Sequence, residues 1–163
     1  MFKKLAFGSL VALVLANASY AQEHEQGWEL SFKRDAFDGT VFPEADMFED
    51  GGSVSSKAHI GVACGDDGSL IASFWPGDIY VGLNAHQVEF KSGSVLRKFT
   101  FAAGEVPRLG NRLNLKAEET AAFLDLFANA AESVAYRTEK EQGHFSSIAA
   151  RQVFDIVRAS CPK

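Results

Sequence analysis

The sequence predicts an α+β fold: an antiparallel β-sheet or sandwich built from hairpins, packed with two C-terminal helices and one disulfide. Three observations predict it. Apolar and polar residues alternate over much of the first two thirds of the chain, which is typical of half-buried strands. In the last third the apolar spacing becomes three and four residues, as in amphipathic helices. The chain also contains two cysteines.

Residues 1–21 are typical of a secretory signal peptide. Lys3 and Lys4 precede an apolar run, and Ser19 and Ala21 place small residues before a cleavage position. The run is shorter than the roughly 20 residues that a spanning helix needs. We therefore expect residues 22–163 to form a single globular domain that is periplasmic or secreted and does not insert into the membrane.

Composition and charge exclude some functions. The full chain has a formal net charge of -5, and loss of the two lysines with the signal segment makes it more acidic. Because such a chain has no basic excess to neutralise phosphates, general nucleic-acid binding is not expected. An even cysteine count in an oxidising compartment predicts a disulfide between Cys64 and Cys161.

The elements follow from periodicity and from turn signals. An Asp-Gly turn signal and the turn at residues 92–94 each separate two alternating runs and predict two hairpins. Ser146 is the expected N-cap of the last helix. The acidic stretch 34–52 is expected to be a surface loop with one short element at the most, and residues 103–114 a loop with a short strand near Leu113. The expected strands are residues 28–33, 58–64, 69–75, 87–91, 95–101 and 133–138, and the expected helices are residues 117–131 and 146–160.

Motifs that carry common enzymatic chemistry are missing from the sequence. It contains no G-x-S-x-G, no G-x-x-x-x-G-K, no G-x-G-x-x-G and no H-E-x-x-H. The histidines, His24, His59, His86 and His144, do not show the close spacing of a zinc site. We therefore predict no catalytic residues, no metal and no cofactor.

The acidic stretch also contains phenylalanines that the core pattern does not explain. They can fold the stretch onto the sheet or offer an apolar patch to a partner, and the carboxylates around them suit a cationic protein. A basic set, Arg97, Lys98, Arg108 and Arg112, offers an anion or carboxylate site, although scattered surface charge is the simpler interpretation. The candidate partner-binding residues are Phe37, Phe42, Asp46, Phe48, Glu49 and Asp50.

The order of features resembles a known family. A tryptophan begins the first strand, Cys64 lies in a hairpin strand, Val134-Ala135-Tyr136-Arg137 follows a helix, and an Ala-rich helix ends in Cys161. This order is similar to that of the C-terminal module of periplasmic type VI secretion-associated proteins of the VasI/TagO kind, over residues 28–161. The resemblance implies a β-rich, non-enzymatic accessory protein.

Three functional hypotheses follow. The first is an exported, soluble, non-catalytic cell-envelope protein that acts as a binding or accessory module for a protein or cell-wall partner. The second is a secreted inhibitor of a basic enzyme such as lysozyme, because the chain is acidic. The third is a motif-poor periplasmic hydrolase that uses His59 or His86 with a nearby carboxylate. The sequence does not fix the oligomeric state.

Overall fold

The computed structural model describes residues 27–50, 57–65, 67–77, 85–106 and 110–161. These ranges contain nine strands and two helices. The strands are β1 (Glu29–Arg34), β2 (Val41–Phe48), β3 (His59–Cys64), β4 (Leu70–Trp75), β5 (His86–Ser92), β6 (Val95–Val106), β7 (Gly110–Asn114), β8 (Ser133–Arg137) and β9 (Gln142–Ser146), and the helices are α1 (Ala117–Ala128) and α2 (Ala150–Ser160). The predicted signal peptide lies outside the described residues.

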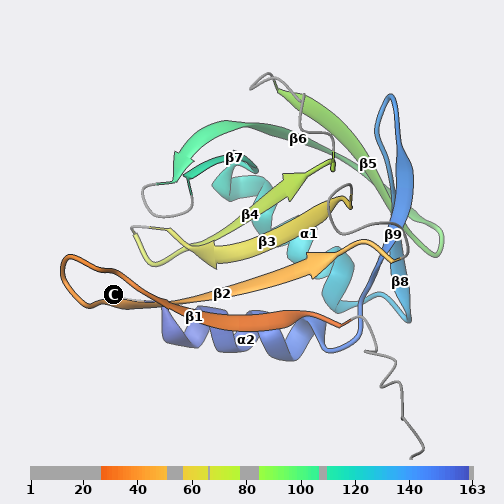
Figure 1. Ribbon diagram of the computed structural model, residues 1–163. Helices are drawn as coiled ribbons and strands as arrows, with labels where there is room; N and C mark the ends of the chain where they lie inside the picture. The colour runs from red at the N-terminus through yellow and green to blue at the C-terminus, as the bar shows by residue number, and fades with distance from the viewer. Residues whose placement is uncertain (1–26, 51–56, 66, 78–84, 107–109, 162–163) are drawn as a thin grey trace, which may run out of the picture.

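All strand pairs are antiparallel, and the order across the sheet is β1-β2-β3-β4-β7-β6-β5-β8-β9. The long strand β6 joins the two halves, because residues 95–101 pair with β5 and residues 102–106 pair with β7. Helix α1 contacts β4 and β8, which belong to different halves, so the sheet curls around this helix (Figure 1). The predicted α+β fold with an antiparallel sheet is confirmed.

The curl brings the end of β2 against the last strand, β9. The backbone N–H of Asp50 donates to the carbonyl oxygen of His144 at 3.0 Å. Beside it, the Tyr136 hydroxyl donates to the Glu49 carboxylate, and the His144 ring lies 3.2 Å from the Asp50 carboxylate. The end of β2 therefore contacts β8 and β9, although these strands are far from β2 in the strand order.

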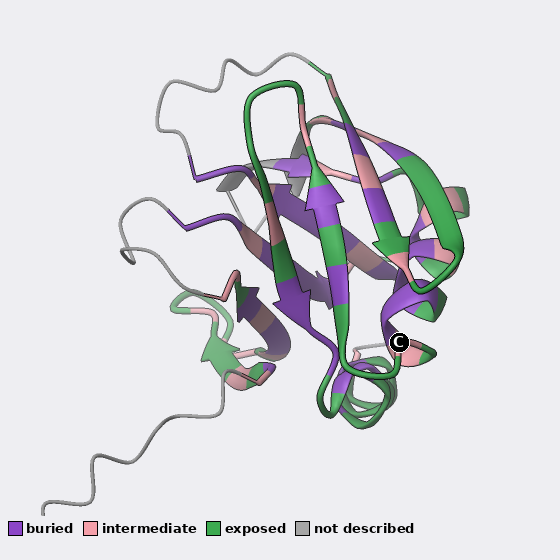
Figure 2. Ribbon diagram, turned by 90° about the vertical axis from the view of Figure 1, so that its right-hand side faces the viewer, coloured by how far each residue is buried: buried purple, intermediate pink, exposed green. Residues whose placement is uncertain are grey.

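Aromatic side chains fill the space between the sheet and α1. Phe74, Phe90, Phe123 and Phe127 are fully buried, and the rings of Phe90 and Phe123 meet edge to face with centroids 5.1 Å apart. Trp28 also contacts Phe127 edge to face. Each such side chain contributes roughly 1.5–3 kcal/mol when it is buried. Figure 2 shows how buried and exposed residues alternate along the strands, as a one-sided core requires.

Helix α2 packs on β2 and β3, and a disulfide fixes its end. Its buried apolar residues are Ala150, Val153, Phe154 and Val157, so the helix is amphipathic, as predicted. The predicted bridge between Cys64 and Cys161 is present, with Cα atoms 5.5 Å apart. No helix among the described residues is long and apolar enough to cross a membrane.

The expectation of a surface loop with one short element at the most was wrong for residues 41–48, because the eight-residue strand β2 forms there. It pairs with β1 on one side and with β3 on the other. Pro43 fits because the register with β3 begins only at Glu44, so Pro43 has no β3 partner that needs its missing N–H. The carboxylate of Glu44 is buried and is paired with Lys33.

Two further boundaries differ from the predictions. Residues 142–146 form β9, so the second helix begins at Ala150, and Ser146 is not its N-cap. The Ser146 hydroxyl instead accepts a hydrogen bond from the backbone N–H of Ile148 at 3.2 Å. Residues 103–114 were expected to be a loop with a short strand near Leu113. That strand is present as β7, but the range also includes the end of β6.

Candidate functional site

The candidate residues of the acidic stretch are spread along β2 rather than gathered in one loop. Phe37 is fully exposed in the turn between β1 and β2, whereas Glu49 and Asp50 follow the far end of β2. An eight-residue strand is roughly 25 Å long, so one small ligand cannot contact both ends. Phe42 is half-buried and Phe48 is 38% exposed.

Each of the three candidate carboxylates has a partner within the chain. Asp46 lies 2.9 Å from the Nε2 atom of His59, and Asp50 is paired with His144. Glu49 accepts a hydrogen bond from Tyr136, and burial together with this carboxylate raises the pKa of the Tyr136 hydroxyl. These carboxylates therefore hold β2 to β3, β8 and β9, whatever else they contact.

The Asp46–His59 pair resembles the carboxylate–histidine part of a catalytic triad. Phe48 stacks on the His59 ring, with centroids 5.1 Å apart, and both side chains of the pair are largely covered. A hydrolase that works through a covalent intermediate also needs a nucleophilic side chain beside the base. Among the described residues, the recorded partners of the His59 ring are Asp46 and Phe48. His86 belongs to β5, which does not pair with β2 or β3, the strands that contain Asp46 and His59.

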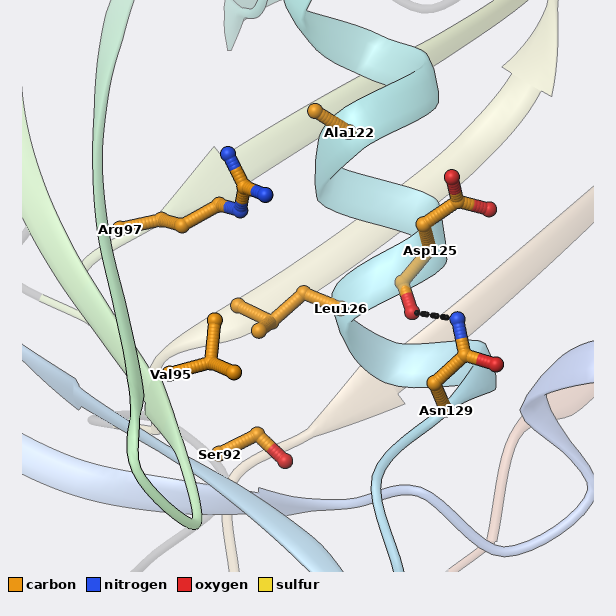
Figure 3. A pocket seen from close by; sticks show the side chains of 7 residues that line it. All are labelled: Ser92, Val95, Arg97, Ala122, Asp125, Leu126 and Asn129. Carbon is orange, nitrogen blue, oxygen red and sulfur yellow. Dashed lines mark hydrogen bonds between the residues drawn. The ribbon is translucent and has the colours of Figure 1, made fainter.

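A groove of about 390 Å³ lies between the β5–β6 hairpin and α1 (Figure 3). We call it the hairpin groove. Its floor is apolar, because Leu126 of α1 is buried and Val95 of β6 faces it across the groove. The volume lies within the roughly 300–1,000 Å³ of typical ligand sites. The lining residues are Ser92, Val95, Arg97, Ala122, Asp125, Leu126 and Asn129.

Arg97 points into the hairpin groove because of its position in β6. It lies two residues before Phe99 and opposite Phe90, so it shares the inner face of the sheet with two core aromatics. The hairpin extends beyond the core at this point, and the guanidinium reaches over the groove toward α1 (Figure 3). No ion pair or hydrogen bond of Arg97 is recorded among the described residues.

The α1 side of the hairpin groove is polar, and hydrogen bonds hold its Asn129 side chain in place. The Asn129 side chain donates to the carbonyl oxygen of Asp125 at 2.8 Å and accepts a hydrogen bond from Arg151 at 2.6 Å. The Asp125 carboxylate is exposed at the same rim. The groove thus combines an apolar floor, one cation on the sheet side, and an amide and a carboxylate on the helix side.

A second hollow, of about 260 Å³, lies on the outer face of the sheet and contains a central ion-pair cluster. Its central carboxylate, Glu89, accepts a hydrogen bond from the Nε atom of Arg137 at 3.0 Å, and Lys98 lies 3.1 Å away. These two cations hold the pKa of Glu89 below its usual value near 4.5, with the bond from Arg137 as the largest cause. Because both of its cations already pair with Glu89, this hollow offers little to an anionic ligand.

The predicted basic set does not form one site. Arg97 and Lys98 lie on opposite faces of β6, because successive residues of a strand alternate. Arg108 and the side chain of Arg112 lie outside the described residues, as does His24. In the described part of the chain, no three His, Cys, Asp or Glu side chains gather to hold a metal ion.

The sequence analysis missed the hairpin groove, although one signal was present. In the alternation of residues 95–101, an arginine occupies the position between Val95 and Phe99 where the inner face calls for an apolar residue. The α1 side of the groove could not be predicted, because its polar residues are ordinary for an exposed helix surface.

Comparisons with models of protein families, with curated proteins and with solved structures found no match.

Proposed function

We propose that this protein is an exported, non-catalytic binding module of the cell envelope, and that the hairpin groove holds its ligand. The observation that carries the proposal is the Arg97 guanidinium, which lies over an apolar floor without a recorded partner in the described residues. The ligand that fits is an extended peptide segment of a protein partner, with a carboxylate next to an apolar side chain.

The chemistry of the groove supports this ligand class. A carboxylate can accept two parallel hydrogen bonds from a guanidinium, and such bonds are stronger than neutral ones. The neighbouring floor of Val95 and Leu126 suits an aliphatic side chain. The rim formed by Ser92 and Asn129 offers a hydroxyl and an amide to a peptide backbone.

Export rests on two features of the chain. Residues 1–21 have the pattern of a secretory signal peptide. The structure contains the disulfide between Cys64 and Cys161, and disulfides persist mainly in oxidising compartments such as the periplasm and the cell exterior. A role beside a type VI secretion apparatus rests on the sequence resemblance alone and belongs to the same proposal.

Selection from a random peptide library on the immobilised protein tests the proposal. We expect the selected peptides to share an acidic residue next to an apolar one. Calorimetry on synthetic copies should then show Kd rising about 10- to 100-fold in Arg97→Gln, because a charge-assisted hydrogen bond is worth about 1.5–3 kcal/mol.

The matched control is Lys91→Gln. Lys91 is an exposed cation of the same hairpin, and it lies on the opposite face of the sheet from Phe90. This variant should bind the selected peptides as the original protein does. Peptides that lack the acidic residue, or equal binding by Arg97→Gln, would contradict the proposed site.

The two other hypotheses stay predictions. Inhibition of a basic enzyme through Asp46, Glu49 and Asp50 would require these carboxylates to engage a partner in addition to their internal contacts. Hydrolysis through His59 would require a nucleophile beyond the recorded partners of its ring.

A further inference from the structure

Strand β1 is an edge of the sheet. In the described part of the chain it has a strand neighbour on one side only, β2 (Figure 1). Its other side presents backbone N–H and C=O groups that can pair with a further strand. Natural sheets usually blunt such edges with charges, prolines or a covering element.

The inner face of this edge is apolar and incompletely covered. Helix α2 packs mainly on β2 and β3, and it leaves part of the inner face of β1 uncovered. Phe32 is 56% exposed, and Leu30, two residues before it on the same face, is half-buried. A partner that continues the sheet past β1 would cover both.

The charges of β1 are self-complementary in one register. A two-fold axis perpendicular to the sheet keeps the inner faces of two copies on the same side. With Ser31 opposite Ser31 of the second copy, Glu29 faces Lys33 of that copy, and Leu30 faces its Phe32. Each of these contacts occurs twice, and opposite charges directly across two strands stabilise the pair.

The neighbouring registers lack this match. An axis at Leu30 or at Phe32 leaves Glu29 and Lys33 without an opposite charge across the strands. An axis at Glu29 or at Lys33 places like charges face to face, which is destabilising. Lys33 pairs with Glu44 of its own copy, but its side chain is 54% exposed and can contact Glu29 of a second copy as well. Glu29 is itself exposed.

We propose that two copies of this chain associate through antiparallel pairing of β1 with β1, centred on Ser31, to form one continuous sheet. The interface joins the two Glu29–Lys33 contacts on the outer face to the two Leu30–Phe32 contacts on the inner face. It is independent of the hairpin groove, which lies between β5, β6 and α1.

Sedimentation equilibrium over a range of concentrations tests the association. We expect a mass twice that of the monomer at high concentration, with dissociation on dilution. Glu29→Lys places two lysines opposite each other at both ends of the interface and should weaken the association at least tenfold. Glu139→Lys makes the same charge change in the exposed turn between β8 and β9 and should leave the association unchanged. Near-UV circular dichroism verifies that both variants fold.

Cross-linking tests the register. Ser31→Cys places two thiols opposite each other at the axis, where directly paired strand residues have the Cα spacing of a disulfide, so a covalent dimer should form. Glu29→Cys puts its thiol opposite Lys33 and should not cross-link. A protein that stays monomeric, a dimer insensitive to Glu29→Lys, or equal cross-linking of both cysteine variants would each overturn the proposal. If this edge pairs with a strand of a different protein instead, the purified chain would stay monomeric.

Discussion

Gly143 lies where β9 passes closest to the residues that follow β2. A Cβ atom added to it would be 2.7 Å from Oε2 of Glu49 and 2.8 Å from Cε1 of Tyr136. The φ angle of Gly143 is not in the positive range, so the backbone itself would accept another residue. The requirement for glycine at this position therefore comes from the Glu49–Tyr136 hydrogen bond packed against it.

The first prediction concerns this contact. Gly143→Ala should lower the free energy of unfolding by about 1–3 kcal/mol, because the added methyl group forces Glu49 and Tyr136 to move. Urea unfolding followed by fluorescence measures the change.

The Glu49→Ala background provides the control. It removes the nearer of the two clashing atoms, so alanine at position 143 should cost less there. An equal cost in both backgrounds would show that the clash with Glu49 does not determine the effect.

At the scale of the elements, Glu89 joins three neighbouring strands. It belongs to β5, and its two cationic partners belong to β6 and β8. Its pKa is lowered in the folded protein, chiefly by Arg137 and then by Lys98. A carboxylate with a lowered pKa stabilises the fold above its ordinary pKa near 4.5, and the contribution is lost as the pH falls through the lowered value.

The second prediction follows from that sign. Glu89→Gln should be less stable than the original protein at pH 7, and the difference between them should shrink as the pH falls below about 4.5. Urea unfolding at a series of pH values measures it. Glu139→Gln, which removes an exposed carboxylate from the β8–β9 turn, should show no comparable trend. A pH-independent difference for Glu89→Gln would contradict the assignment.

Most elements could be predicted from the sequence, and β2 shows why some could not. The alternation exists there, with Ala45 and Met47 facing the core. It was hidden because the intervening positions carry Glu44 and Asp46, and because Pro43 signals a break. Acidic residues usually mark solvent, whereas these two are covered and find cationic or imidazole partners on adjacent strands. That compensation depends on pairing that periodicity does not report.

The β9 error has a similar origin. Glycine beside a polar stretch usually indicates a turn, and Ser146 before an amphipathic run usually indicates an N-cap. Gly143 is instead required by a close approach to Glu49, and Ser146 supports the turn that precedes α2. The hairpin groove was missed for a related reason. Its lining residues come from the β5–β6 hairpin and from α1, which meet only in the folded chain.

At the scale of the whole molecule, the local hairpins are joined by pairings between distant strands. β4 pairs with β7, β5 pairs with β8, and the chain just after β2 bonds to β9. Such pairings require the chain to close long loops before it gains their contacts. The disulfide between Cys64 and Cys161 imposes one of these long closures covalently, over a separation of 97 residues, and ties α2 to β3.

The third prediction concerns this closure. Replacing Cys64 and Cys161 together by alanine should lower the free energy of unfolding by about 2–5 kcal/mol, because the unfolded chain regains the entropy of a long loop. The urea dependence should steepen as well, since an unfolded chain without the bridge exposes more surface. Ser160→Ala changes the exposed neighbouring residue and should have little effect. A loss below about 1 kcal/mol, small beside the range expected for such a bridge, would mean that the packing of Val153, Phe154 and Val157 holds α2 by itself. In that case the bridge would contribute little to the equilibrium stability of the fold.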